Sequence, residues 1–214
     1  TSDTVSLSIA IGNTAPSIIS VSTIPAQTVT ELGKTTVMFS FIANDPDGVG
    51  NLNDSFARAI FNRTDETTKT NYSCSLESDL NISAANYTCG MDIWYWDGAG
   101  RWDINVSIDD ASAERAENTA TNFTLDLTTA MVMSPSALTW PSISLVSTNQ
   151  LSNNDPILIN NTGNKDIING NVKVTAYSLQ GVTTATDYLV ANNFTVHTAD
   201  VCDAGTFMVN GTAT

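Results

Sequence analysis

Residues 101–108 read Arg-Trp-Asp-Ile-Asn-Val-Ser-Ile, and this octapeptide alternates between apolar and polar side chains after its first residue. Successive side chains of an extended strand point to opposite faces, so the two kinds of side chain separate completely. The face that we expect to lie in a core carries Trp102, Ile104, Val106 and Ile108. The face that we expect to meet solvent carries Asp103, Asn105 and Ser107. The octapeptide therefore predicts an antiparallel strand that is buried on one face only.

The same two-residue period recurs along the whole chain, and no long period of 3.6 residues competes with it. It predicts strands at residues 4–11, 16–22, 34–43, 56–62, 87–96, 101–108, 120–127, 157–160, 171–177, 188–190, 194–197 and 206–209. Turn residues lie between them, as at 45–48 and 97–100, and residues 110–117 are expected to form a loop. Many short strands at this spacing are typical of β-sandwiches. The fold class predicted here is therefore all-β.

The character of the chain changes near residues 128–133, where Ser134-Pro135 and Trp140-Pro141 follow. We therefore expect an N-terminal strand at 1–12, a first β-sandwich domain at 13–130 and a second at 131–214. The second domain is interpreted as truncated at its C-terminal end. The chain starts at Thr1 without a basic and apolar leader, which is interpreted as a signal peptide already removed.

The composition excludes several kinds of partner. The formal net charge is −14, and the eight Lys and Arg residues are scattered singly, whereas nucleic-acid binding requires a basic cluster. An anionic membrane surface would repel such a chain. No apolar segment of about 18 residues is present, so no membrane span is expected. An acidic, Ser-, Thr- and Asn-rich surface favours solubility and the binding of divalent cations.

Ten Asn-X-Ser/Thr sequons run through the chain, and none has proline in the middle. They lie at Asn53, Asn62, Asn71, Asn81, Asn86, Asn105, Asn122, Asn160, Asn193 and Asn210. An asparagine of this kind carries an N-glycan only if it crosses a secretory membrane and lies on an exposed surface. The sequons therefore predict an extracellular, N-glycosylated protein. The alternative is that a chain rich in Asn and Thr acquires sequons by composition alone.

The three cysteines predict one disulfide. Cys74 and Cys89 are 15 residues apart and have similar flanking residues, so we expect them to be bonded. Cys202 is left over, to pair outside this chain or to stay free. No Cys/His spacing indicates a zinc site.

Several framework segments lie along the chain. In the first half they are Asn13-Thr14-Ala15-Pro16-Ser17-Ile18, residues 44–48 (Asn-Asp-Pro-Asp-Gly) and residues 100–106 (Gly-Arg-Trp-Asp-Ile-Asn-Val). In the second half they are residues 138–140, 153–156 and 160–164. These segments resemble the Ig-like repeats of archaeal cell-surface proteins. The resemblance implies two Ig-like domains in a secreted, glycosylated protein of a cell-surface fibre or S-layer. It implies no catalytic residues.

Residues 44–54 form the best candidate metal site. Asp45, Asp47, Asn51 and Asp54 offer the carboxylate and amide oxygens that Ca²⁺ prefers. The loop lacks the spacing and the distal glutamate of an EF-hand. Pro46-Asp47-Gly48 also makes a good β-turn by itself, with Gly48 accepting a positive φ. A β-turn without metal is therefore the alternative to a Ca²⁺ site, and no cofactor is required.

Two further features concern binding and catalysis. Trp94, Tyr95, Trp96 and Trp102 form an aromatic group that either packs in a core or provides a platform for sugars. His197 is the only histidine, and the motifs of hydrolases, zinc proteases and phosphate-binding loops are missing. Asp109 and Asp110 are interpreted as solvated or calcium-adjacent carboxylates rather than as a glycosidase pair. The sequence therefore predicts a protein that is not an enzyme.

The segment 4–11 carries Val5, Leu7, Ile9 and Ile11 on one face and small residues on the other. Either it is the first strand of its own domain, or it is donated to the open sheet of a neighbouring subunit. Head-to-tail donation that does not close into a ring gives a filament. The function expected is a subunit of a homopolymeric, pilus-like filament or surface layer outside the cell. The alternative is an adhesin or a carbohydrate-binding accessory module.

Overall fold

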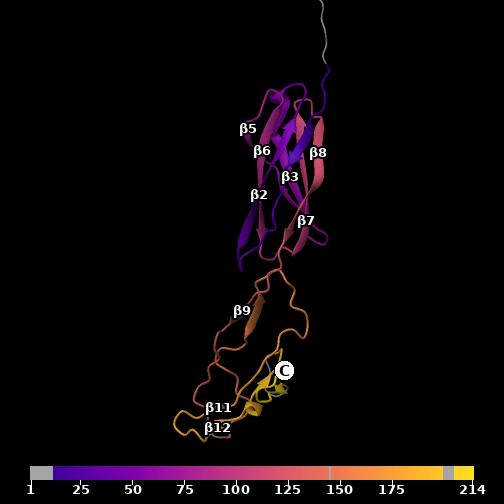
Figure 1. Ribbon diagram of the computed structural model, residues 1–214. Helices are drawn as coiled ribbons and strands as arrows, with labels where there is room; N and C mark the ends of the chain where they lie inside the picture. Colours follow the sequence, from indigo (N-terminus) through magenta and orange to yellow (C-terminus); the bar gives the residue numbers. More distant parts are fainter. Residues whose placement is uncertain (1–11, 145, 200–204) are drawn as a thin grey trace, which may run out of the picture. The chain divides into compact units, whose positions relative to one another are not determined.

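The computed structural model describes residues 12–144, 146–199 and 205–214. These residues divide into two compact units. Unit 1 extends to Thr129 and also includes Gly163–Lys165, and unit 2 consists of Ala130–Thr162 and Asp166–Thr214. Figure 1 shows strands as the main regular element of both units. The described residues contain 3₁₀ turns but no α-helix, so the all-β class is confirmed.

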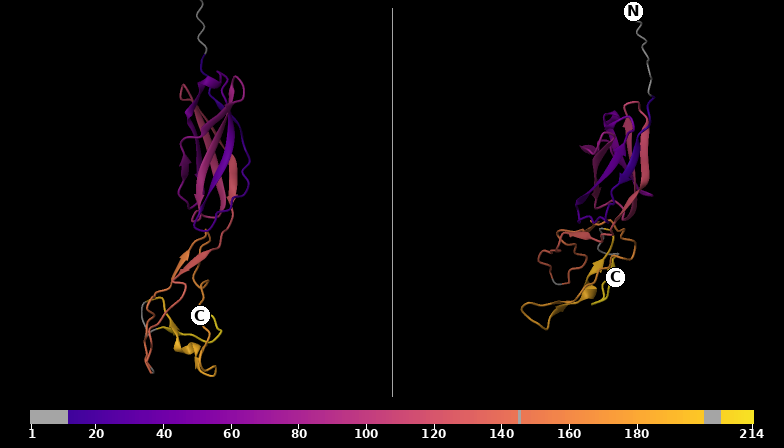
Figure 2. Two further views of the ribbon diagram at one scale, coloured as in Figure 1. Left: turned by 90° about the vertical axis from the view of Figure 1, so that its left-hand side faces the viewer. Right: turned by 45° about the horizontal axis from the view of Figure 1, so that its top comes forward.

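Unit 1 consists of two antiparallel four-stranded sheets (Figures 1 and 2). The first sheet has the order β1-β2-β6-β5, with β1 at Ser17–Val21, β2 at Lys34–Asn44, β6 at Ala84–Trp94 and β5 at Ser75–Asp79. The second sheet has the order β4-β3-β7-β8, with β4 at Lys69–Asn71, β3 at Leu52–Asn62, β7 at Gly100–Asp110 and β8 at Arg115–Leu125. Both sheets contribute side chains to one hydrophobic core.

The core of unit 1 forms because each central strand is apolar on one face. The four apolar side chains predicted to point inward from residues 101–108 are all buried, which confirms the period read from that octapeptide. The ring of Phe39 on β2 lies 6.0 Å from the ring of Phe61 on β3, and this contact joins the two sheets. Phe41 and Tyr87 stack at 5.2 Å within the first sheet. Burying several aromatic side chains in one layer supplies most of the driving force for this unit.

The strands of unit 1 differ from the sequence-based expectation in several places; for example, β6 begins at Ala84 rather than at residue 87. Strands β4 and β5 were not predicted, and β3 begins at Leu52 rather than at residue 56. The loop expected at 110–117 is shorter, since β8 already begins at Arg115. Asp110 explains the shorter loop, because its Oδ1 accepts hydrogen bonds from the backbone N–H groups of Ser112 and Glu114. A carboxylate that binds two backbone donors closes a tight turn.

Unit 2 contains three separate two-stranded antiparallel sheets. They pair β9 (Met131–Ser134) with β10 (Leu158–Asn161), β11 (Leu179–Gln180) with β12 (Tyr188–Leu189), and β13 (Thr195–Val196) with β14 (Thr206–Phe207). The strand expected at 171–177 is absent except for a bridge between Thr175 and Ala213. Within its described residues, unit 2 therefore has no pair of larger sheets like those of unit 1.

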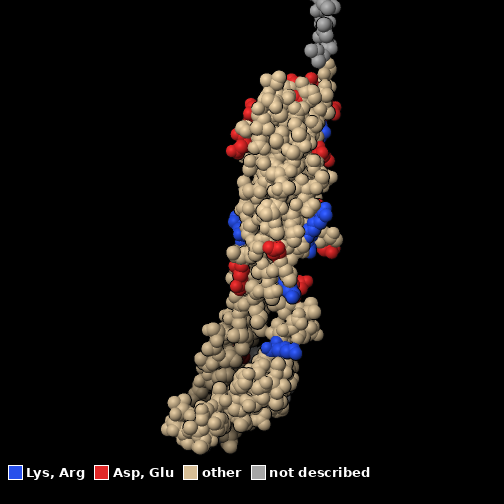
Figure 3. Space-filling view, viewed as in Figure 1, with Lys and Arg blue, Asp and Glu red and all other residues tan. Residues whose placement is uncertain are grey.

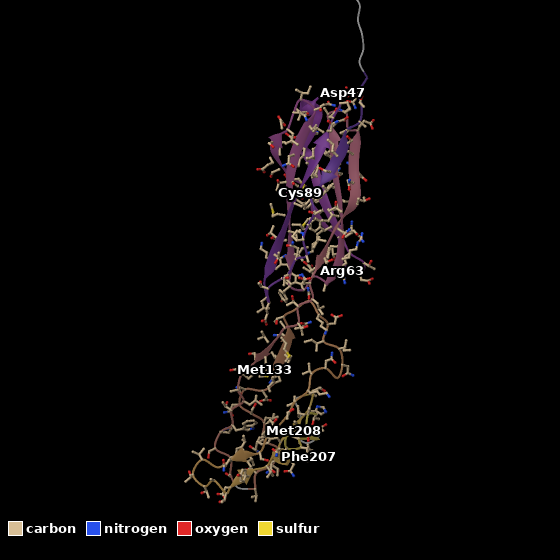
Figure 4. All side chains as sticks on the ribbon, in the orientation of Figure 1. Asp47, Arg63, Cys89, Met133, Phe207 and Met208 are labelled. Atoms are coloured by element: carbon tan, nitrogen blue, oxygen red, sulfur yellow. A yellow bond between two sulfur atoms is a disulfide. The ribbon has the colours of Figure 1, made fainter. Side chains whose placement is uncertain are left out.

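Unit 2 also buries little apolar surface. Ala191 and Met208 are the buried hydrophobic residues among its described positions. Met133 on β9 stays 50% exposed and Phe207 on β14 stays 68% exposed, and both are labelled in Figure 4. Figure 3 shows charged side chains along unit 1, whereas the visible surface of unit 2 is largely uncharged. Unit 2 therefore combines exposed apolar side chains with few charged ones.

The described residues include no helix that is long and apolar enough to cross a bilayer.

Candidate functional site

A disulfide fixes the segment that follows β4 against the first sheet. Cys74 and Cys89 are bonded, with their Cα atoms 4.5 Å apart, and both are buried. The backbone N–H of Cys74 also donates to the carbonyl of Ala57 on β3. These contacts hold residues 71–74 against both sheets. Figure 4 shows Cys89 between Asp47 and Arg63 along the length of unit 1.

Asn71 reaches across from β4 to β6. Its Nδ2 donates to the carbonyl oxygen of Gly90 at 2.9 Å, and its Oδ1 accepts from the backbone N–H of Ser73 at 2.9 Å. Asn71 and Gly90 both line a shallow hollow of about 460 Å³ on the first sheet. The other lining residues are Thr36, Thr70, Tyr72, Met91 and Asp92.

A stacked pair of tryptophans lies where β6 ends. The rings of Trp94 and Trp96 are 4.8 Å apart and nearly parallel, at 8°. Trp96 is 56% exposed, and the Nζ of Lys34 lies 5.4 Å from the centre of the Trp94 ring. Trp102, in contrast, is completely buried in the core. The predicted aromatic group is thus divided, with Trp102 in the core and Trp94 and Trp96 forming a surface platform.

Polar groups lie beside this platform. In the register of β2 and β6, Lys34 is opposite Trp94 and Thr36 is opposite Asp92. The Asp92 carboxylate accepts hydrogen bonds from both Lys34 and Thr36. These bonds hold the pKa of the Asp92 carboxyl below its usual value, so the group is ionised at neutral pH. Sequence reasoning missed Lys34, Thr36 and Asp92, because only strand register brings them to Trp94.

The loop at 45–51 forms a hydrogen-bonded turn. Asp45 is buried; its Oδ1 accepts from the backbone N–H of Asp47 and its Oδ2 accepts from Nδ2 of Asn51. Gly48 has a φ of 116°, as expected for the Pro-Asp-Gly turn. Asn51 also donates to Asn13, whose own Nδ2 donates to Asp110. Asp45, Asp47 and Asn51 therefore lie together, tied to the chain that enters β1.

Asp54 lies apart from that group. Its carboxylate accepts a hydrogen bond from the Tyr87 hydroxyl at 2.7 Å. Burial and the nearby Asp54 carboxylate raise the pKa of Tyr87 above its usual value. Among the residues that the structure describes, no group of three or more His, Cys, Asp or Glu side chains is placed to hold a metal ion. The hydrogen bonds of Asp45 favour the turn over the Ca²⁺ site.

The interpretation of Asp109 and Asp110 as solvated carboxylates is wrong, because both are buried. Arg115 donates to both oxygens of Asp109, at 2.6 and 3.0 Å. Those bonds lower the pKa of the Asp109 carboxyl, and Arg58 lies 3.7 Å away. Arg58 also donates a hydrogen bond to the hydroxyl of Ser107. Ser107 is buried, although we expected its face of the strand to meet solvent. Both carboxylates therefore form hydrogen bonds within the protein, at the end of β7.

All ten sequon asparagines lie within the described residues, and none is buried. Those that are exposed are Asn62, Asn81, Asn160, Asn193 and Asn210. Those that are half-buried are Asn53, Asn71, Asn86, Asn105 and Asn122. Each of these side chains is thus at least partly accessible to a glycosylating enzyme.

Two predictions lie outside the described residues. They are the contact strand with Val5, Leu7, Ile9 and Ile11, and the unpaired Cys202. Neither is described structurally.

No protein-family model matches the chain, and neither a curated protein nor a solved structure is significantly similar to it.

Proposed function

We propose that this chain is a structural subunit of an extracellular, glycosylated cell-surface filament or surface layer of archaeal type. Its two units are Ig-like domains, and the copies are joined by β-strand complementation. The residues of one copy that enter the next are 4–11, with Val5, Leu7, Ile9 and Ile11 as contact side chains. The polymer is built from identical chains.

The observation that carries this proposal is the incomplete burial of unit 2. Its β9–β10 ribbon has exposed apolar side chains on both faces, including Met133 and Leu158. In the described part of the chain, β9 and β10 have no strand partner other than each other. Covering such side chains removes apolar surface from water and so favours assembly. A two-stranded apolar ribbon is also a template for adding a strand.

A hollow beside β10 offers a place for the added strand. It measures about 590 Å³ and is lined by Ile159, Asn161, Asp166, Ile167 and Val172. Three of these five residues are aliphatic, which matches the apolar face predicted for residues 4–11. Unit 2, residues 130–162 and 166–214, contains only six charged residues in the sequence. They are Asp155, Asp166, Lys173, Asp187, Asp200 and Asp203. Charge therefore does little to keep two copies of unit 2 apart.

The accessible sequons support the extracellular part of the proposal. Sequon asparagines on both sheets of unit 1 and in unit 2 are at least partly accessible, so glycans could be attached on several sides of the subunit. The disulfide between Cys74 and Cys89 is of a kind that persists in an oxidising compartment.

The test removes the donor and then supplies it again. A chain of residues 13–214 should sediment as a monomer, whereas the full chain should form long polymers. A synthetic peptide of residues 1–12 should bind the shortened chain through unit 2. Polymers of unchanged length from the shortened chain would refute strand complementation by this segment.

A second function is favoured by the exposed face of Trp96. A stacked tryptophan pair with charged and hydroxyl side chains beside it is suited to bind sugars, as in an adhesin or a carbohydrate-binding module. This function predicts that the unglycosylated chain binds added oligosaccharides, whereas a purely structural subunit does not require such binding.

A further inference from the structure

We infer that the N-glycan attached to Asn71 packs against the platform formed by Trp94 and Trp96. This surface, which we call the glycan seat, consists of Lys34, Thr36, Asp92, Trp94 and Trp96. The inference rests on the proposed glycosylation. It adds that the glycan covers this exposed aromatic surface. The ligand class is a pyranose oligosaccharide that is covalently part of the same chain.

The attachment atom lies beside the seat because two contacts hold it there. The Nδ2 of Asn71 is 2.9 Å from the carbonyl of Gly90, on the same strand as Asp92 and Trp94. Asn71 and Asp92 line the same hollow. The disulfide at Cys74 anchors the chain three residues further on. A sugar on Nδ2 therefore starts at the edge of the seat.

Glycosylation is compatible with this position of the amide. A bond forms between Nδ2 and the anomeric carbon of an activated glycosyl phosphate; the phosphate leaves with the bonding electrons and the amide loses one proton. The nitrogen keeps its other hydrogen, which can still donate to Gly90. The second contact of Asn71 uses its Oδ1, which the reaction does not change. The segment can thus keep its conformation after the sugar is added.

The distance along β6 suits a short oligosaccharide. Gly90, Asp92 and Trp94 are spaced by two residues, so their side-chain positions share the outward face of the strand. With a rise of about 3.3 Å per residue, Trp94 lies roughly 13 Å along the strand from Gly90. A glycan of a few pyranose units spans that length, and Trp96 extends the seat beyond it.

The chemistry of the seat matches a sugar better than a purely apolar partner. Trp96 is stacked on Trp94 and is 56% exposed, so its indole offers a flat apolar surface to the C–H groups of a pyranose. The Asp92 carboxylate accepts hydrogen bonds from sugar hydroxyls, Lys34 can donate to them, and the Thr36 hydroxyl oxygen can accept from them. A purely apolar partner would leave the Lys34–Asp92 pair desolvated without new hydrogen bonds, which is costly. The adjacent sequon supplies a sugar in the required place.

The experiment measures how far the tryptophans of the glycosylated full chain are quenched by acrylamide. The Trp140→Phe background removes the other exposed tryptophan, and Trp102 is buried. Ser73→Ala abolishes the sequon at Asn71 but keeps both hydrogen bonds of Asn71, since Ser73 contributes only its backbone N–H. Thr124→Ala, which abolishes the sequon at Asn122 on the second sheet, is the matched control.

We expect quenching to be low in the parent and in Thr124→Ala, and to rise in Ser73→Ala to the level of the unglycosylated chain. Equal melting temperatures of the variants would exclude unfolding as the cause. Glycopeptide mass spectrometry separates the two possible failures. Sugars at Asn71 together with unchanged quenching in Ser73→Ala would overturn the glycan seat alone. A chain without sugar at any sequon would overturn the proposed glycosylation and the seat together. Binding of added oligosaccharide by a chain whose Asn71 is never modified would overturn the inference and support the carbohydrate-binding alternative.

Discussion

At the scale of single residues, the second sheet of unit 1 depends on Trp102. Its ring is buried and stacks near Phe123 at 6.4 Å, while its Nε1 donates to the carbonyl of Gly98. Trp102→Ala should destabilise the protein by about 3–5 kcal/mol, because it leaves a large cavity and an unpaired carbonyl. Urea unfolding followed by circular dichroism measures this loss. Trp140→Ala is the control, since Trp140 is 37% exposed and should cost far less. Similar losses for both variants would contradict the assignment of Trp102 to the core.

The buried Asp109 predicts a pH dependence. Hydrogen bonds from Arg115 lower its pKa in the folded state, so the unfolded state binds more protons near that pKa. The stabilisation is therefore present above the unfolded pKa of about 3.9 and is lost as the pH falls through the lower folded value. Arg115→Ala should reduce stability at neutral pH and flatten its fall in acid. Chemical unfolding at several pH values tests this, and an unchanged acid profile would count against the pair.

Residue-level predictions from sequence were reliable where a single strand determines them. The inward face of residues 101–108 followed from the two-residue period alone, because alternation is a property of the extended backbone. Asp109 could not be judged in this way. Its burial depends on Arg58 and Arg115, which reach it from the two neighbouring strands. No pattern within β7 indicates those partners.

At the scale of elements, the disulfide joins the segment after β4 to the central strand β6. Replacing both Cys74 and Cys89 by alanine should lower the free energy of unfolding by about 3 kcal/mol, the loop-closure term for a loop of 15 residues. The replacement should also loosen Asn71 from Gly90. Thermal melts of the reduced wild type and of the variant should agree, and a melt equal to that of the oxidised wild type would contradict this.

The turn at 45–48 predicts a response to metal. Since both oxygens of Asp45 accept hydrogen bonds within the protein, we expect the same melting temperature with Ca²⁺ and with a chelator. Asp45→Ala should lower stability by about 1–3 kcal/mol in either buffer, because it leaves buried donors unpaired. Differential scanning calorimetry checks both statements. A rise in melting temperature that depends on Ca²⁺ and is lost in Asp45→Ala would instead establish the metal site.

Elements were harder to predict where strands are short. β4 has three residues and β5 has none buried, so neither has an apolar period that sequence reading can detect. Their place comes from pairing with β3 and β6. The glycan seat beside Asn71 could not be predicted from the sequence for the same reason. Asn71 and Trp94 are both visible in the sequence, but only the packing of β4 next to β6 brings them together.

At the scale of the whole molecule, the two units differ in how much of their apolar surface they bury. Unit 1 has one shared core between two sheets. Unit 2 leaves most of its apolar side chains exposed across three small sheets. The sequence did not predict β9 or β11, and the strand predicted at 171–177 is reduced to one bridge, because alternation does not reveal whether a strand has enough partners. The proposed assembly follows from this difference.

The most direct test is electron cryomicroscopy of the assembled full chain at a resolution that shows side chains. Strand complementation predicts that residues 4–11 of each copy are paired with the β9–β10 ribbon of the next, with Val5, Leu7, Ile9 and Ile11 facing the hollow lined by Ile159 and Val172. A map in which these residues pair with unit 1 of their own copy, or in which particles stay single, would contradict it.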